Sequence, residues 1–124
     1  MIEDKKDILV ANDEDDIARI VVDRLIFIGY EVRRANNGHE CLERIAERVP
    51  DLLLLDLRMP GMDGVEVLRK IRPLSPPLTT IVVSASADRQ LIQQCLEHGA
   101  TNYLIKPFDG AALAEQVRAA LEDE

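Results

Sequence analysis

Five short, mainly apolar runs recur along the chain, and each is followed by a segment whose apolar residues repeat every three or four positions. The central run, residues 52–55, is four consecutive leucines, so it lacks the alternation of a half-exposed strand. A continuous apolar run of this length, closed by Pro60 and Gly61, is typical of a strand covered on both faces. The pattern as a whole predicts strands at residues 8–11, 31–35, 52–55, 80–84 and 102–105.

The segments between the strands have helical periodicity. Gly29 and Gly99 are well placed to end helices, and Asp88 and Asp109 are well placed to cap helix starts. The positions expected to face the core are Ile17, Val21, Leu25 and Ile28, then Leu42, Ile45 and Ala46, then Leu91, Ile92, Cys95 and Leu96, and finally Leu113, Val117 and Leu121.

A strand followed by a helix, five times over, predicts an α/β fold. We expect a doubly wound five-stranded parallel sheet with right-handed crossovers and helices on both faces. The common flavodoxin-like (βα)5 arrangement has the strand order 2-1-3-4-5. The run at residues 31–35 is more polar than the others, so it is expected at an edge of the sheet.

Size and composition exclude several classes of protein. The 124 residues suffice for one domain with a real core, and residues 1–124 are interpreted as a single domain. A formal net charge of −8 argues against direct nucleic-acid binding, which needs clustered Lys and Arg. Since there is neither a signal-peptide core nor an apolar run near the ~20 residues of a membrane helix, a cytoplasmic location without a membrane is predicted. Cys41 and Cys95 are interpreted as small buried hydrophobic residues in a reducing compartment.

Polar residues stand where the predicted strands end. Asn12 and Asp13 follow the first strand, Asp56 the third and Lys106 the fifth, while Ser84 ends the fourth. The first and third strands are neighbours in the predicted order, so Asp13 and Asp56 would face each other, and two close carboxylates repel unless a cation lies between them. Mg²⁺ suits such oxygen ligands. With Lys106 and Ser84 these residues describe a pocket for a transferring phosphoryl group, in which Asp56 is the nucleophile.

Each of these residues also has an ordinary structural interpretation. Asp56 can simply begin a turn, and Asp13 can belong to an acidic cluster at a helix start. Lys106 can be a surface lysine. His39 and His98 have no partner ligands at metal spacing, so we interpret both as surface or capping residues.

Five signatures occur in order between residues 8 and 121. They are the acidic cluster after the first strand, Asp56 with Met59-Pro60-Gly61-Met62-Asp63-Gly64, Ser84-Ala85, Gly99-Ala100, and Tyr103-Leu104-Ile105-Lys106-Pro107-Phe108. With this ordered set the chain resembles the CheY-like receiver domain, or response regulatory domain, of bacterial two-component systems. The resemblance implies a phosphoprotein that acts in a signal-transducing phosphorelay.

The resemblance also implies roles for single residues. Asp56 would accept a phosphoryl group from the phosphohistidine of a histidine kinase or phosphotransfer protein. Asp13, Asp56 and the backbone carbonyl of Arg58 would bind Mg²⁺. Lys106 and Ser84 would contact the phosphoryl oxygens.

A switch is implied as well. Tyr103 would turn inward as Ser84 moves toward the phosphate, and the face of the fourth helix, fifth strand and fifth helix would then change for a downstream protein target. The Lys106–Pro107 bond is typically cis in the family. Either a monomer or a phosphorylation-dependent dimer is compatible with this resemblance. No turnover of a separate substrate is expected, because the domain assists only its own phosphorylation and dephosphorylation.

The chain departs from the family pattern at Asn12, where most members carry Asp or Glu. We predict weaker Mg²⁺ binding there without its loss, since the amide oxygen can still hold a metal-bound water. Arg58 and Ser86 occupy positions that tune the lifetime of the aspartyl phosphate in the family, and Arg58 is expected to point to solvent.

Other functions are considered as alternatives. A pseudo-receiver would bind partners without phosphorylation, and Asn12 leaves this open. A phosphatase of the haloacid-dehalogenase kind needs a second Asp two residues beyond the nucleophile, where Arg58 stands. A flavodoxin-like FMN carrier needs a hydroxyl- and glycine-rich loop after the first strand, where the acidic cluster stands instead.

Overall fold

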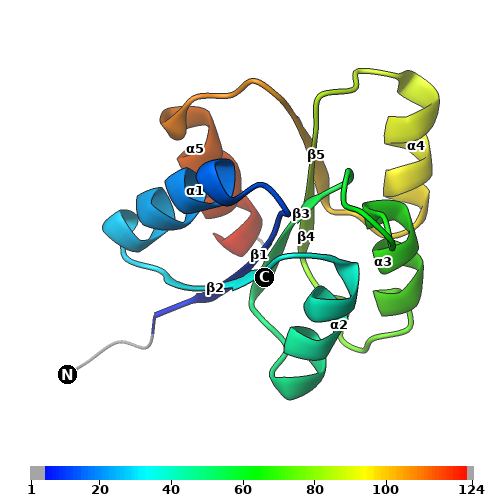
Figure 1. Ribbon diagram of the computed structural model, residues 1–124, viewed down its shortest axis with the longest axis horizontal. Helices are drawn as coiled ribbons and strands as arrows, with labels where there is room; N and C mark the ends of the chain where they lie inside the picture. The colour runs from blue at the N-terminus through cyan, green and yellow to red at the C-terminus, as the bar shows by residue number, and fades with distance from the viewer. Residues whose placement is uncertain (1–4, 123–124) are drawn as a thin grey trace.

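A computed structural model of the protein describes residues 5–122. Its elements are β1 (Asp7–Ala11), α1 (Asp15–Ile28), β2 (Glu31–Ala35), α2 (Gly38–Glu47), β3 (Leu52–Asp56), α3 (Gly64–Ile71), β4 (Thr80–Ser84), α4 (Arg89–Glu97), β5 (Asn102–Ile105) and α5 (Gly110–Glu122). The strands form one parallel sheet in the order β2-β1-β3-β4-β5 (Figure 1). The predicted α/β fold, the strand order and the edge position of β2 are confirmed.

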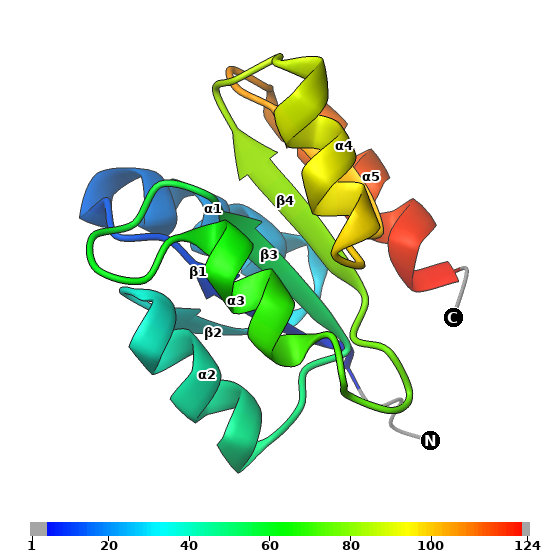
Figure 2. The ribbon, with the colours of Figure 1, turned by 90° about the vertical axis from the view of Figure 1, so that its right-hand side faces the viewer.

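Helices cover both faces of the sheet. Helices α1 and α5 lie on one face and α2, α3 and α4 on the other, which Figure 2 turns toward the viewer. Leu53 and Leu55 pack against the three-helix side, and Leu52 and Leu54 pack against α1 and α5. Since successive strand residues point to opposite faces and both faces are covered, all four leucines of β3 are buried.

The helix ends agree with their predicted signals. Gly29 and Gly99 lie just after α1 and α4 with φ angles of 125° and 100°, a region that favours glycine. Asp88 and Asp109 each accept a hydrogen bond from a backbone N–H at a helix start, at 2.9 and 2.8 Å.

Three positions that were predicted to face the core are exposed instead. Ile28 is 42% exposed, Leu96 is 41% exposed, and Ala46 is also at the surface. Ala46 and Leu96 follow the buried residues Ile45 and Cys95, and neighbouring helix residues point about 100° apart. Ile28 is the last residue of α1, just before the chain turns toward β2. A helical period therefore located the buried stripe but not its width.

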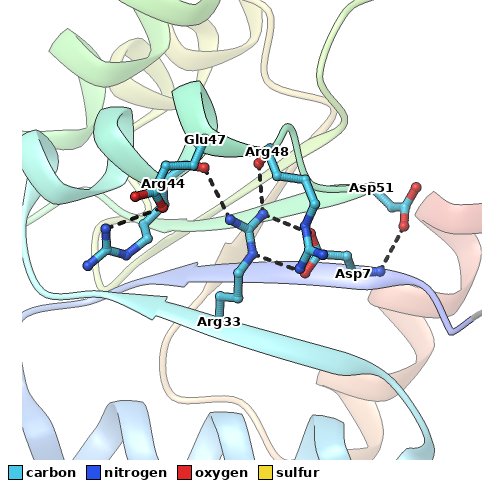
Figure 3. Close-up of polar contacts among 6 residues, drawn as sticks. All are labelled: Asp7, Arg33, Arg44, Glu47, Arg48 and Asp51. Atoms are coloured by element: carbon cyan, nitrogen blue, oxygen red, sulfur yellow. Dashed lines mark hydrogen bonds and ion pairs between the residues drawn. The ribbon is translucent and has the colours of Figure 1, made fainter.

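The edge strand β2 carries two successive arginines, whose side chains point to opposite faces of the sheet. Figure 3 shows Arg33 on the α2 side, where it donates to both carboxylate oxygens of Asp7 at 2.7 and 3.2 Å. The same guanidinium donates to the carbonyls of Arg44 and Arg48 at 3.1 and 2.8 Å. It thereby pairs a buried carboxylate and satisfies carbonyls at the end of α2. The side chain of the second arginine, Arg34, lies on the other face of the sheet.

Within the described residues, we find no helix with both the length and the apolar character that crossing a bilayer requires.

Candidate functional site

Asp56 is the last residue of β3 and is only 3% exposed. Its Oδ2 accepts a hydrogen bond from Lys106 Nζ at 2.6 Å, and its Oδ1 accepts one from the backbone N–H of Arg58 at 2.9 Å. A buried carboxylate needs such compensation, because an unpaired charge in the interior costs several kcal/mol (roughly 3–5 when a partner is removed). The carboxylate is thus held in one orientation by one ammonium group and one backbone donor.

Lys106 follows β5, fifty residues beyond Asp56 in the sequence. Its backbone N–H donates to the carbonyl of Ser84 at 2.8 Å, and its bond to Pro107 is cis. Strands β3 and β5 lie on either side of β4, and all three end at the same edge of the sheet. This common edge brings Lys106, which follows β5, to Asp56 at the end of β3. Lys106 is 23% exposed at its side chain, so the ammonium lies between the buried Asp56 and solvent.

Asn12 comes one residue after the register pair Ala11 and Leu55, so it lies level with Asp56 on the neighbouring strand. It is 5% exposed, and its Oδ1 accepts a hydrogen bond from the backbone N–H of Glu14 at 2.9 Å. Asn12, Asp56 and Lys106 line one small cavity of about 20 Å³. The structure therefore brings these three predicted site residues together.

Asp13 lies one residue further along and is exposed. It lines a larger, open cavity of about 480 Å³ together with Arg58, Met59 and Asp63. Within residues 5–122, Asp13 takes part in none of the ion pairs, and the structure records no contact between its carboxylate and that of Asp56. Its oxygens are thus available to a ligand in this cavity.

The donor set suits a hard divalent cation. Two carboxylates, those of Asp13 and Asp56, the carbonyl of Arg58 and the amide of Asn12 are all oxygen donors at the carboxyl edge of β1 and β3. Mg²⁺ keeps several waters and takes only one or two protein carboxylates, so it needs no larger acidic cluster. In the described part of the chain, no group of three or more His, Cys, Asp or Glu side chains is placed to hold a metal.

A second hydrogen-bonded connection begins at Ser84, the last residue of β4, which is 7% exposed. Its Oγ accepts a hydrogen bond from the backbone N–H of Ser86 at 3.1 Å. Tyr103 of β5 is partly buried, and its hydroxyl donates to the carbonyl of Ser86 at 2.8 Å. A displacement of Ser84 would therefore act on the segment that holds the Tyr103 ring.

Gly64 has no side chain, and this allows the start of α3 to lie close to the site. A Cβ there would come within 2.7 Å of the Leu57 side chain and 2.9 Å of the Asp56 carbonyl. The backbone N–H of Gly64 donates to the Leu57 carbonyl at 3.0 Å. This close approach is a physical reason for glycine at the end of the Met59–Gly64 motif.

Sequence reasoning missed Arg34 as a residue of this region. Its guanidinium donates twice to the carbonyl of Asn12 and pairs with Asp15. The only available signal was the Arg-Arg pair in an edge strand, and nothing local says which loop such a side chain reaches.

Both cysteines are free and buried, as predicted, and both lie in the core on the three-helix side. Burial raises the pKa of the Cys41 thiol to about 12 and also raises the pKa of Cys95. They have a packing role.

Comparison with known proteins agrees with this arrangement. Residues 8–118 match the family described as the response regulator receiver domain. The transcriptional regulatory protein ZraR of Salmonella typhimurium is 38% identical over 98% of this chain and 27% of its own length. The DNA-binding transcriptional regulator NtrC of Escherichia coli is 37% identical over 90% of this chain and 25% of its own length. The chain thus spans about a quarter of these relatives.

Solved structures give the same result. A CheY-like response regulator receiver domain protein from Methanospirillum hungatei superposes with a TM-score of 0.92 at 32% identity, covering 97% of this chain and 96% of that one. The receiver domain of NtrX from Brucella abortus superposes with a TM-score of 0.88 at 31% identity, covering 94% of this chain and 99% of that one.

Proposed function

This chain belongs to the response regulator receiver domain family, and from that premise we propose that Asp56 accepts a phosphoryl group in a Mg²⁺-dependent phosphorelay step. The donor would be the phosphohistidine of a histidine kinase or phosphotransfer protein. The observation that carries the proposal is the contact of 2.6 Å between Lys106 Nζ and a carboxylate that is only 3% exposed. A buried acid at a strand end, paired with one lysine, is suited to accept a negatively charged group.

The transfer forms one bond and breaks one bond. A carboxylate oxygen of Asp56 forms the new O–P bond, the P–N bond of the donor breaks, and its electron pair returns to the imidazole nitrogen. The N–H of Arg58 and the ammonium of Lys106 hold the carboxylate in place before transfer. Afterwards Lys106 and the hydroxyl of Ser84 donate to the phosphoryl oxygens, which are strong acceptors.

Asp13, Asp56 and the carbonyl of Arg58 are the residues that would hold Mg²⁺, with Asn12 acting through a bound water. The cation supplies positive charge beside the phosphoryl oxygens. Asn12 is neutral, so this site has one negative charge fewer than a site with an acid at that position. Arg58 and Ser86 are proposed to modulate the lifetime of the aspartyl phosphate.

The output is proposed to be protein binding through the face of α4, β5 and α5. The phosphoryl group carries about 1.5–2 negative charges in place of the single charge of the free carboxylate, and its oxygens are strong acceptors that would draw the Ser84 hydroxyl toward them. Ser86 and Tyr103 follow through their hydrogen bonds to this segment. A cytoplasmic monomer or phosphorylation-dependent dimer is expected, without turnover of a separate substrate, because Arg58 stands where a phosphatase of the haloacid-dehalogenase kind needs its second Asp.

A phosphorylation-independent receiver is the second candidate, and the neutral Asn12 beside Asp56 is the observation that favours it. Incubation with acetyl phosphate and Mg²⁺, followed by intact-protein mass spectrometry, distinguishes the two. A mass gain of one phosphoryl group that is lost in Asp56→Asn and without Mg²⁺ supports phosphorylation. No mass gain at any Mg²⁺ concentration, with beryllofluoride also failing to bind, supports the second candidate.

A further inference from the structure

Arg34 joins the loop between β1 and α1 to the first residue of α1. Its Nε and Nη2 donate to the carbonyl of Asn12 at 3.3 and 3.0 Å, and its Nη1 pairs with Asp15 Oδ1 at 2.9 Å. The arginine side chain is 26% exposed, so most of it is enclosed. It comes from the edge strand β2, twenty-two residues away from Asn12.

The two anchor points of Arg34 lie on either side of Asp13. One is the residue before it and the other lies two residues after it, at the start of α1. The backbone N–H of Glu14 closes the same loop by donating to Asn12 Oδ1. We infer that Arg34 is a positioning residue that fixes the loop so that Asp13 faces the cation site, an inference that rests on the function proposed above. Groups that orient metal ligands from outside change metal affinity about 10–100-fold when they are removed.

If Arg34 acted on Mg²⁺ only through its charge, removing it would change the Mg²⁺ affinity in the opposite direction. A guanidinium near a cation site repels the cation, so deleting it would tighten Mg²⁺ binding. Here Arg34 is paired with Asp15, whose side chain is 87% exposed, so the pairing and solvent screening together weaken that repulsion. Lysine keeps the charge but lacks the rigid planar fork, so its ammonium, on a flexible stem, does not hold the carbonyl and the carboxylate in the same fixed geometry. Arg34→Lys therefore separates geometry from charge.

Arg33 provides a matched control on the adjacent position of the same strand. Its guanidinium holds a carboxylate and two carbonyls on the α2 side of the sheet (Figure 3), and successive strand residues point to opposite faces, so Arg34 lies on the other side. Arg33→Lys removes a fork whose carboxylate partner is more buried than that of Arg34, 11% against 87% exposed, so it reports at least as much general loosening. Arg34→Met, which removes the charge too, completes the set.

The test is a titration with Mg²⁺ alone, in which ¹⁵N-resolved NMR signals of the Asp13 and Arg58 amides monitor binding. We expect Arg34→Lys to weaken Mg²⁺ binding roughly tenfold and Arg33→Lys to leave it within about twofold of wild type. In metal-free protein, amide hydrogen exchange of Glu14 should be faster in Arg34→Lys and unchanged in Arg33→Lys, because the loop that protects this N–H is released.

Equal Mg²⁺ affinity in Arg34→Lys and wild type would overturn the inference, and so would tighter binding in Arg34→Met with no change in Arg34→Lys. Phosphorylation by acetyl phosphate, measured over a range of Mg²⁺ concentrations up to saturation, keeps this failure apart from failure of the proposed function. If wild type is phosphorylated on Asp56 and Arg34→Lys needs no more Mg²⁺ than wild type, only the role of Arg34 is lost. If wild type neither binds Mg²⁺ nor gains a phosphoryl group, both proposals fall.

Discussion

Replacing Lys106 with methionine should destabilise the protein more than replacing its partner Asp56 with asparagine. The reason is the unequal exposure of the pair, since 4% of the Asp56 side chain is exposed against 23% for Lys106. Without the lysine, the carboxylate stays buried and keeps only the hydrogen bond from the N–H of Arg58. Without the aspartate, the lysine can turn its ammonium into water while its aliphatic part stays packed.

The magnitudes follow from this asymmetry. Removing one partner of a buried ion pair costs roughly 3–5 kcal/mol. The remaining donor and the neighbouring cavity lower this, so we expect a loss of about 2–3 kcal/mol for Lys106→Met. For Asp56→Asn the loss should be about 1 kcal/mol or less, as for other partly exposed charges. With a urea m-value of about 1.5 kcal/mol/M, the first change lowers the unfolding midpoint by about 1.3–2 M.

Urea unfolding followed by circular dichroism in chelator-treated buffer measures these midpoints. The double variant Asp56→Asn/Lys106→Met should be more stable than Lys106→Met alone, because no buried charge is left without its partner. Equal losses in the two single variants would refute this reasoning. So would a double variant as unstable as Lys106→Met, since the loss would then come from packing and not from the stranded carboxylate.

Three further changes test other parts of the structure. Asn12→Asp adds a negative charge level with Asp56, so Mg²⁺ should bind more tightly in calorimetric titration. Equal affinity would contradict the prediction that the neutral Asn12 weakens Mg²⁺ binding. Gly64→Ala should lower stability by about 1–3 kcal/mol in urea unfolding, because its Cβ would come within 2.7 Å of Leu57, and an unchanged midpoint would refute the close packing. Burial raises the pKa of the Cys41 thiol to about 12, so this group should resist a thiol reagent at pH 8 in the native state and react once urea unfolds the chain; rapid native labelling of its peptide, located by mass spectrometry, would contradict its burial.

Single residues were interpreted correctly where their partners are close in the sequence, and wrongly where their burial depends on distant elements. Asp88 and Asp109 were identified as helix caps because a cap bonds a backbone group two or three residues away. Ile28, Ala46 and Leu96 were wrongly assigned to the core, because helical period does not report how far the sheet and its neighbouring helices extend over each turn.

The amino-acid pattern alone determined the five strand–helix units and the polar residues at the ends of the first, third, fourth and fifth strands, whereas the strand order was expected from the common arrangement of such units. These features depend on periodicity of 2 or 3.6 residues, on turn residues and on the burial of both sheet faces, all of which are written locally in the chain. Only the tertiary structure decided that Lys106 holds one oxygen of Asp56, that Asn12 lies level with it, and that Arg34 reaches over the first loop. Such contacts join residues 22–50 positions apart, and they exist only once parallel strands have brought their ends to a common edge.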